Sequence, residues 1–264
     1  MRTALTIAGS DSSGGAGIQA DLKTFAALGV YGLSTVTAVT AQSTAGVTAS
    51  LPLPADHVTA QIEAVAGDIA IHATKTGMLA TAAIVEAVSA AIEEMQLPLV
   101  VVDPVMLSTG GQRLLDDDGV LALSSTLLPR ARVVTPNVPE AGALSRSRVA
   151  SLSDVRDAAR RIQDLGVAAV VVTGGHSVHA AEVVDVLLDG DVFYEFRATR
   201  IPGPDAHGTG CAFASAVAAQ LALGSSLPEA VERAQRYVAG ALAGRVAIGR
   251  GQSVLDHFWQ TRSG

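Results

Sequence analysis

Glycine and cysteine come together at the start of an alanine-rich helical pattern near the C-terminus, which reads His207-Gly208-Thr209-Gly210-Cys211. The first amides of a helix lack partners within it, so this segment can direct several N–H groups toward one point. Such a point binds phosphate, or the charge that develops on a transferring phosphoryl group. The helix dipole is expected to lower the pKa of Cys211, which could then act as a base or nucleophile. It could equally be a small buried core residue.

A second glycine-rich segment, residues 9–17, follows the first apolar run of the chain. Residues 15–20 match the glycine spacing of a dinucleotide-binding fingerprint. That fingerprint also requires an acid about 20 residues further on, and after Asp21 the next acid is Asp56. A Walker A loop is excluded too, because alanine follows the glycines where Lys-Ser/Thr is required. We expect a loop that lets a ligand approach the backbone, with Asp21 either contacting that ligand or stabilising the helix dipole.

Short apolar runs alternate with helical patterns, which predicts an α/β protein with a mostly parallel sheet covered by helices on both faces. The predicted strands are 4–8, 33–39, 99–102, 132–134 and 168–172. The predicted helices are 15–28, 54–66, 81–95, 153–165 (capped by Ser153), 209–223 and 228–246. Runs 183–188 and 192–196 flank Asp-Gly-Asp and predict a small antiparallel edge. No linker or repeat divides residues 1–264, so we expect one domain.

Polar residues follow the predicted strands at their carboxyl ends. Gln42, Asp103, Asn137 with Glu140, and Thr173 each come soon after a different strand. Ligands of open α/β sheets bind at this edge, although the loops there are polar in any case. The whole set together favours a binding site over a row of ordinary loops.

The composition predicts a large globular core, since 49% of the 264 residues are hydrophobic and 16% are charged. A net charge of −7 without runs of Lys or Arg argues against a nucleic-acid-binding protein. A single cysteine excludes an intrachain disulfide. No apolar stretch of about 18 residues predicts a membrane span. We expect a cytoplasmic protein that binds small molecules, and neither nucleic acid nor membrane.

Six segments, in order, resemble the motifs of the hydroxymethylpyrimidine and phosphomethylpyrimidine kinases, a family of the ribokinase-like superfamily. They are residues 8–25, 39–44, 74–79, 102–106, 135–141 and 207–211. The resemblance implies a three-layer α/β/α fold without a separate lid domain, and a homodimer. It also implies ATP- and Mg²⁺-dependent phosphorylation of 4-amino-5-hydroxymethyl-2-methylpyrimidine, and then of its monophosphate, in thiamine biosynthesis.

The resemblance further implies roles for single residues. The positions that match the family's pyrimidine contacts are Gly9, Asp21, Gln42, Met78 and Val105. The positions that match its nucleotide side are Asp103, Asn137, Glu140 and Thr173, with Asp103 and Glu140 toward Mg²⁺. Cys211 takes the place of the catalytic base, and the amides of Gly208, Thr209, Gly210 and Cys211 stabilise the transferred group.

The chain departs from the family pattern on the phosphate side. Relatives commonly carry lysine where Thr109 and Thr173 stand, and both lysines are expected near the ATP phosphates. Two alternatives therefore stay open: a pyridoxal-type vitamin-precursor kinase, and a homologue that binds its ligand with weakened catalysis. His176 and His179 are expected to be solvated or hydrogen-bonded loop residues rather than metal ligands.

Overall fold

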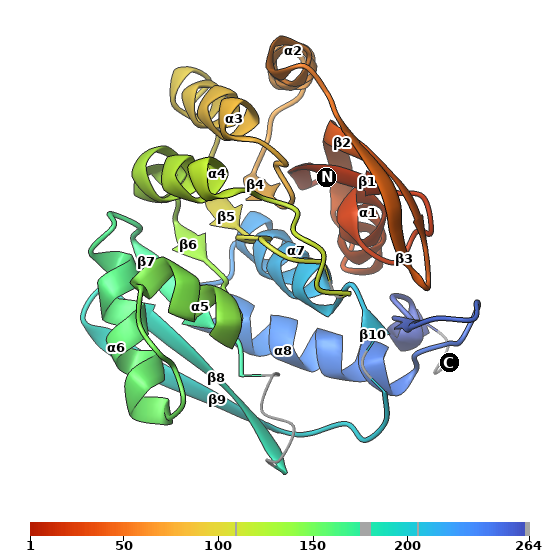
Figure 1. Cartoon of the computed structure of the whole chain (residues 1–264), viewed down its shortest axis with the longest axis vertical. Helices are drawn as coiled ribbons and strands as arrows, with labels where there is room; N and C mark the ends of the chain where they lie inside the picture. The colour runs from red at the N-terminus through yellow and green to blue at the C-terminus, as the bar shows by residue number, and fades with distance from the viewer. Residues whose placement is uncertain (109, 175–180, 205, 262–264) are drawn as a thin grey trace.

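A nine-stranded sheet forms the centre of the computed structural model, which describes residues 1–108, 110–174, 181–204 and 206–261 (Figure 1). The strand order is β3-β2-β1-β4-β5-β6-β7-β8-β9. Neighbours from β2 to β7 run parallel, whereas β3, β8 and β9 pair antiparallel. The strands are β1 (Thr3–Asp11), β2 (Tyr31–Ser43), β3 (Gly46–Pro52), β4 (Ala73–Thr76), β5 (Val100–Val102), β6 (Val133–Val134), β7 (Ala169–Val172), β8 (Glu182–Asp189) and β9 (Val192–Thr199).

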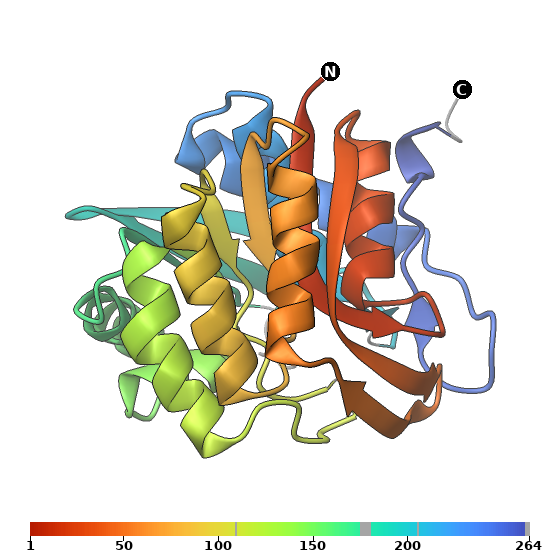
Figure 2. The ribbon, with the colours of Figure 1, turned by 90° about the horizontal axis from the view of Figure 1, so that it is seen from above.

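Helices cover both faces of this sheet (Figures 1 and 2). Successive strand side chains point to opposite faces, so Val100 and Val102 pack in one core while Val101 packs in the other. The first core lies under α2 (Ala55–Ala66), α3 (Ala82–Glu94), α4 (Asp117–Ala122), α5 (Val138–Ser145) and α6 (Leu152–Gln163). The second lies under α1 (Gly17–Ala27), α7 (Thr209–Ala222) and α8 (Leu227–Ala243). The predicted three-layer α/β/α arrangement is confirmed, as is the antiparallel hairpin β8–β9.

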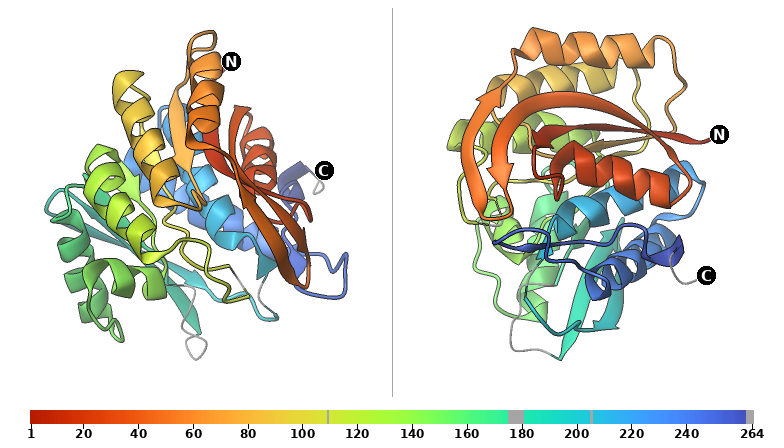
Figure 3. Two further views of the ribbon diagram at one scale, coloured as in Figure 1. Left: turned by 45° about the horizontal axis from the view of Figure 1, so that its top comes forward. Right: turned by 90° about the vertical axis from the view of Figure 1, so that its right-hand side faces the viewer.

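The hairpin β2–β3 curves away from the sheet toward the C-terminal segment (Figure 3). At its tip, Thr44 accepts hydrogen bonds from the backbone N–H groups of Gly251 and Gln252. Beside this contact, β10 (Ala206–His207) pairs with β11 (Ser253–Val254) and leads directly into α7. The tip, the C-terminal loop and the start of α7 are thereby held together.

Several elements differ from the sequence prediction. Strand β4 reads Ala-Thr-Lys-Thr and is buried throughout. It was not predicted, because its polar residues do not form an apolar run. Helix α5 was not predicted, although Asn137 and Glu140 form a capping box at its start. The predicted cap Ser153 is wrong, because Ser151 caps α6 by accepting from the N–H of Asp154.

Predictions for Thr109, His176 and His179 concern residues outside those that the structure describes. Within the described ranges, no helix combines the length and apolar character needed to cross a membrane.

The C-terminal segment is fixed to the helical layer by a buried histidine. His257 Nδ1 lies 3.2 Å from Thr24 Oγ1 in α1 and 3.3 Å from the Tyr237 hydroxyl in α8. Burial, with the nearby charge of Lys23, lowers the pKa of His257 from 6.5 to about 4. The imidazole is therefore neutral in the folded protein at neutral pH.

This histidine should make stability depend on pH. Because its folded pKa lies below its unfolded pKa, its contribution is complete above pH 6.5 and is lost as the pH falls toward 4. We expect about 3 kcal/mol of unfolding free energy to disappear over that range. Urea unfolding of the wild type and His257→Gln at pH 7 and pH 4 measures this, and the variant should lose correspondingly less. Equal losses in the two proteins would contradict the assignment.

Candidate active site

The carboxyl ends of β4 to β7 bring the predicted nucleotide-side residues to one edge of the sheet. Asp103 directly follows β5, and its N–H donates to the carbonyl of Thr76 at the end of β4 (2.9 Å). Asn137 follows β6 and forms an isolated parallel bridge with Thr173, which follows β7. The structure thus collects Asp103, Asn137 and Thr173 from three strand ends that are distant in sequence.

The start of α7 has the geometry that an anion site requires. Gly208 precedes the helix with φ of 88°, in the left-handed region. A Cβ there would lie 2.0 Å from the carbonyl oxygen of Gly15, so only glycine fits. No side chain caps the helix, and Ala212 makes the first return bond, to Gly208 O. The amides of Thr209, Gly210 and Cys211 are therefore unused by the helix itself.

Asp21 lies in a different environment from the one expected of it. It is the fifth residue of α1 rather than a first-turn acid, and its side chain is fully buried. Its two oxygens lie 3.1 and 3.0 Å from Lys75 Nζ and also accept from Thr6 Oγ1 and Ser215 Oγ. The structure therefore assigns Asp21 to an internal ion pair with Lys75 and gives no support to its direct contact with a pyrimidine.

Lys75, whose place the sequence left undetermined, lies at the centre of this edge. Its ammonium is fully buried and sits 3.9 Å from Asp103 Oδ2 as well as beside Asp21. Burial lowers the pKa of Lys75, but the negative charges of Asp21 and Asp103 outweigh that effect and raise it. Gly77 leaves the necessary room, because a Cβ there would lie 2.7 Å from the ammonium nitrogen.

Cys211 is a neutral thiol in this environment, which corrects the expectation of a lowered pKa. Burial raises the pKa of the thiol to about 12, and the charges of Asp103 and Asp21 add to that rise, while Lys75 opposes it. The Asp103 carboxylate lies close enough for its charge to act on the thiol. The helix dipole does not offset the desolvation of a thiolate here.

Two neighbouring carboxyl groups at this edge hold protons unusually well. Burial raises the pKa of Asp103 to about 6 despite the charge of Lys75. Burial and the charge of Asp103 raise the pKa of Glu140 to about 8 against the hydrogen bonds of the capping box. Asp103 Oδ2 is buried and has no hydrogen-bond partner among the described residues. This pair would be stabilised by a cation.

The remaining predicted substrate contacts fall into two groups. Gly9 lies under Met78, since a Cβ on Gly9 would meet Met78 Cε at 2.5 Å, and the Met78 carbonyl accepts from Thr37 Oγ1. Val105 is half-buried just beyond Asp103. Gln42 lies apart from these at the end of β2, where it faces a cavity.

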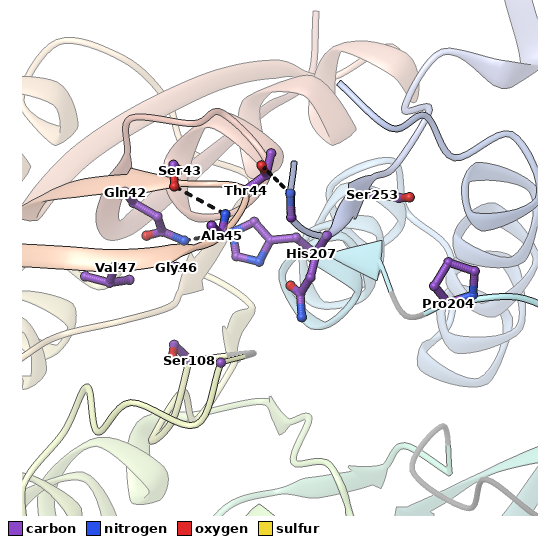
Figure 4. Close-up of a pocket in the computed structure, with 13 residues that line it drawn as sticks. Gln42, Ser43, Thr44, Ala45, Gly46, Val47, Ser108, Pro204, His207 and Ser253 are labelled. Atoms are coloured by element: carbon purple, nitrogen blue, oxygen red, sulfur yellow. Dashed lines mark hydrogen bonds between the residues drawn. The ribbon is translucent and has the colours of Figure 1, made fainter. Parts of the chain in front are cut away.

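That cavity has a volume of about 470 Å³ and opens beside the start of α7 (Figure 4). Its walls come from the β2–β3 tip, the loop after β5, His207 and the C-terminal loop. Gln42 is the one predicted substrate contact among the described residues that line it. His207 and Asp11, which were not among the predicted site residues, form a polar cluster with Gln42.

Comparison with known proteins identifies the family. The family model described as phosphomethylpyrimidine kinase matches residues 11–256. The chain belongs to this family. It is 45% identical to the hydroxymethylpyrimidine/phosphomethylpyrimidine kinase of Bacillus subtilis over 255 residues, covering 97% of this chain and 94% of that protein.

Two further relatives bear on its function. A thiamine biosynthesis bifunctional protein of Geobacter sulfurreducens is 46% identical over 96% of this chain, which spans only 52% of that longer protein. Among solved structures, pyridoxal kinase from Staphylococcus aureus in complex with AMP-PCP and pyridoxal superimposes with a TM-score of 0.91 at 37% identity. The alignment covers 99% of this chain and 95% of that one.

Gly208→Ala tests the conformation that exposes the α7 amides. The left-handed φ and the contact with Gly15 should cost about 2 kcal/mol or more of unfolding free energy. Gly210→Ala is the matched control, because a Cβ there meets no heavy atom within 4 Å and alanine favours the helix. Denaturant unfolding compares the two, and equal stabilities would contradict the assigned geometry.

Lys75→Met tests the buried ion pair. Leaving the Asp21 carboxylate buried without its partner should lower the unfolding free energy by about 3–5 kcal/mol. Asp21→Asn added to Lys75→Met should restore part of that loss, because the unpaired charge is gone. Arg113→Met, which removes a pair exposed to solvent, should change stability by less than about 1 kcal/mol. Urea unfolding measures all four proteins, and a double variant no more stable than Lys75→Met would argue against a dominant charge effect.

Proposed function

We propose that the chain is an ATP-dependent kinase of 4-amino-5-hydroxymethyl-2-methylpyrimidine and of its monophosphate, acting in thiamine biosynthesis as one domain over residues 1–264. The observation that carries the proposal is the meeting of the uncapped start of α7 with a buried Asp103–Lys75–Cys211 cluster at the carboxyl edge of the sheet. Family membership agrees with it, since the relatives named above are kinases or a thiamine biosynthesis protein.

The amides of Thr209, Gly210 and Cys211 are suited to the transferred phosphoryl group. Three N–H groups fixed at a helix start stabilise the charge on its oxygens without reorganising during the reaction. They also suggest how the chain functions with threonine at position 173, whose hydroxyl can donate a hydrogen bond but carries no charge. Nucleotide binding accords with the AMP-PCP complex of the structural relative.

Cys211 is proposed as the group that takes the proton from the substrate hydroxymethyl oxygen. At rest it is a neutral thiol near the Asp103 carboxylate, so it cannot accept a proton while it keeps its own. Asp103 must receive the thiol proton as Sγ receives the substrate proton. The net proton transfer then runs from the substrate oxygen to Asp103. The electrons of that oxygen form the new bond to the γ-phosphorus of ATP, and the bond from this phosphorus to the bridging oxygen breaks, so that ADP leaves with those electrons.

The donor set beside Asp103 fits Mg²⁺. Asp103 Oδ2 lacks a hydrogen-bond partner among the described residues, and Glu140 lies close enough for the two charges to interact. No cluster of three or more potential ligands occurs in the described ranges, which agrees with an ion held by one or two carboxylates, water and phosphate. When bound, Mg²⁺ neutralises charge on the β- and γ-phosphate oxygens.

Two expectations about substrate and assembly stay predictions. A pyridoxal-type activity is the second candidate, because the structural relative was solved with pyridoxal. A homodimer would find an apolar surface on the β2–β3 hairpin, where the cross-strand partners Val39 and Leu51 are 46% and 67% exposed.

Release of ADP tests the proposed function. We expect the wild type with Mg-ATP to turn over the hydroxymethylpyrimidine and its monophosphate, and to prefer both to pyridoxal. Cys211→Ala should lower kcat by about 10²–10⁴, the usual contribution of general acid–base catalysis. The unfolding midpoint of the variant serves as its control for folding. Pyrimidine binding without ADP release would favour the binding homologue, and full turnover by Cys211→Ala would exclude this cysteine as the base.

A further inference from the structure

One imidazole nitrogen has two polar neighbours at the wall of the cavity. His207 Nε2 lies 2.8 Å from Gln42 Nε2 and 3.0 Å from Asp11 Oδ2. Figure 4 shows the amide of Gln42 facing this ring. His207 and Asp11 are 8% and 3% exposed, so water does not replace these contacts. A single nitrogen cannot accept a hydrogen bond from the amide and donate one to the carboxylate at the same time.

Asp11 decides which of these roles His207 Nε2 takes. Its carboxylate accepts from the backbone N–H groups of Ser13, Gly15 and Ala16 and from the Ser13 hydroxyl. Burial alone would raise the pKa of Asp11, but hydrogen bonds from His207, Ser13 and Ala16 outweigh it and hold the pKa at about 2. The group is ionised at neutral pH and can only accept, so Nε2 must carry a hydrogen.

The hydrogen on His207 Nε2 also determines the orientation of the Gln42 amide. Two N–H groups cannot lie 2.8 Å apart without repulsion, so the end of the Gln42 amide nearest His207 must be its carbonyl. A carboxamide keeps the same outline after a half-turn about its terminal C–C bond, and its partners decide which end is oxygen.

The opposite end of the amide gives independent support. Thr40 Oγ1 lies 2.9 Å from the carbonyl oxygen of Ser10 and 3.0 Å from the second amide atom of Gln42. A hydroxyl has one hydrogen, and the Ser10 carbonyl can only accept it. The amide atom facing Thr40 must therefore be the nitrogen, which donates to the hydroxyl oxygen.

We infer that Asp11 and His207 are positioning residues that hold the Gln42 carboxamide with its oxygen toward His207 and its nitrogen toward Thr40, and so select the edge of the substrate ring that can bind. For the identity of that ring, the inference rests on the proposed function. The imidazole of His207 is held in place by close packing against Gly15, because a Cβ on Gly15 would lie 2.6 Å from His207 Cδ2.

A fixed carboxamide recognises a ring with a matching edge. One N–H and one oxygen lone pair of Gln42 are left over for a ligand. An aminopyrimidine offers a ring nitrogen that accepts beside an amino group that donates, and this pair fits the amide in only one direction. The hydroxymethyl group is then pointed the same way in each binding event. A pyridine ring without an amino group has no such edge.

The protonation of His207 can be measured without any substrate. A two-bond ¹H–¹⁵N correlation spectrum of the ligand-free protein at pH 7 distinguishes protonated from unprotonated ring nitrogens, and His207→Phe identifies the signals. We expect His207 Nε2 to carry a hydrogen. An unprotonated Nε2 would overturn the inference, whatever the enzyme phosphorylates.

Selectivity tests the consequence. The measurement is the ratio of kcat/KM for the aminopyrimidine to that for the same pyrimidine without its 4-amino group. In His207→Phe the ratio should fall about tenfold, as for the loss of one hydrogen bond of about 1.4 kcal/mol. His207→Gln, which keeps an N–H donor, should restore part of the ratio, since a purely structural role would not depend on that donor.

His257→Gln is the matched control, because it removes a buried histidine that does not line the cavity. It should leave the ratio unchanged. An unchanged ratio in His207→Phe would contradict the positioning role. If the wild type phosphorylates neither pyrimidine, the proposed function fails, while the protonation experiment still decides the orientation of Gln42.

Discussion

The buried ion pair between Lys75 and Asp21 joins the strands and helices whose relative positions define the site. Lys75 comes from β4 and Asp21 from α1, and the Asp21 oxygens also accept from Thr6 in β1 and Ser215 in α7. Taking two charges out of water costs several kcal/mol per ion, so such a pair persists only where each charge is fully hydrogen-bonded. Here those bonds link the middle of the sheet to the two helices that supply the glycine-rich loops.

A second consequence of this pair is electrostatic. The Lys75 ammonium lies 3.0 Å from Asp21 Oδ2 and 3.9 Å from Asp103 Oδ2, so it neutralises the charge of Asp103 only in part. Burial raises the pKa values of Asp103, Glu140 and Cys211, and the charge of Asp103 adds to the rise at the other two groups. The outer edge of the cluster thus favours a cation next to the amides of α7, which favour an anion. A metal–phosphate complex satisfies both requirements.

Much of this arrangement could be predicted from sequence, because hydrophobic runs and glycine-rich turns report local structure. The α/β/α layers, the hairpin β8–β9 and the placing of Asp103, Asn137 and Thr173 on one edge follow from those patterns. The burial of charged side chains does not follow from those patterns. Asp21 and Lys75 are 54 residues apart, and nothing local shows that they pair, so neither this ion pair nor strand β4 was predicted. The thiol of Cys211 was misjudged for the same reason, since its pKa depends on desolvation by distant segments.

The two polar clusters of the site are constructed differently, which bears on how substrate choice could change within the fold. The Lys75 cluster connects the sheet with α1 and α7, so its residues cannot vary without loss of stability. The cluster of Asp11, His207 and Gln42 lies where the β2–β3 hairpin, the loop after β1 and β10 meet, outside the main hydrophobic cores. A change there alters hydrogen-bond polarity while the phosphate side keeps its geometry. This separation provides a physical route by which one scaffold can serve kinases of pyrimidine and pyridine rings alike.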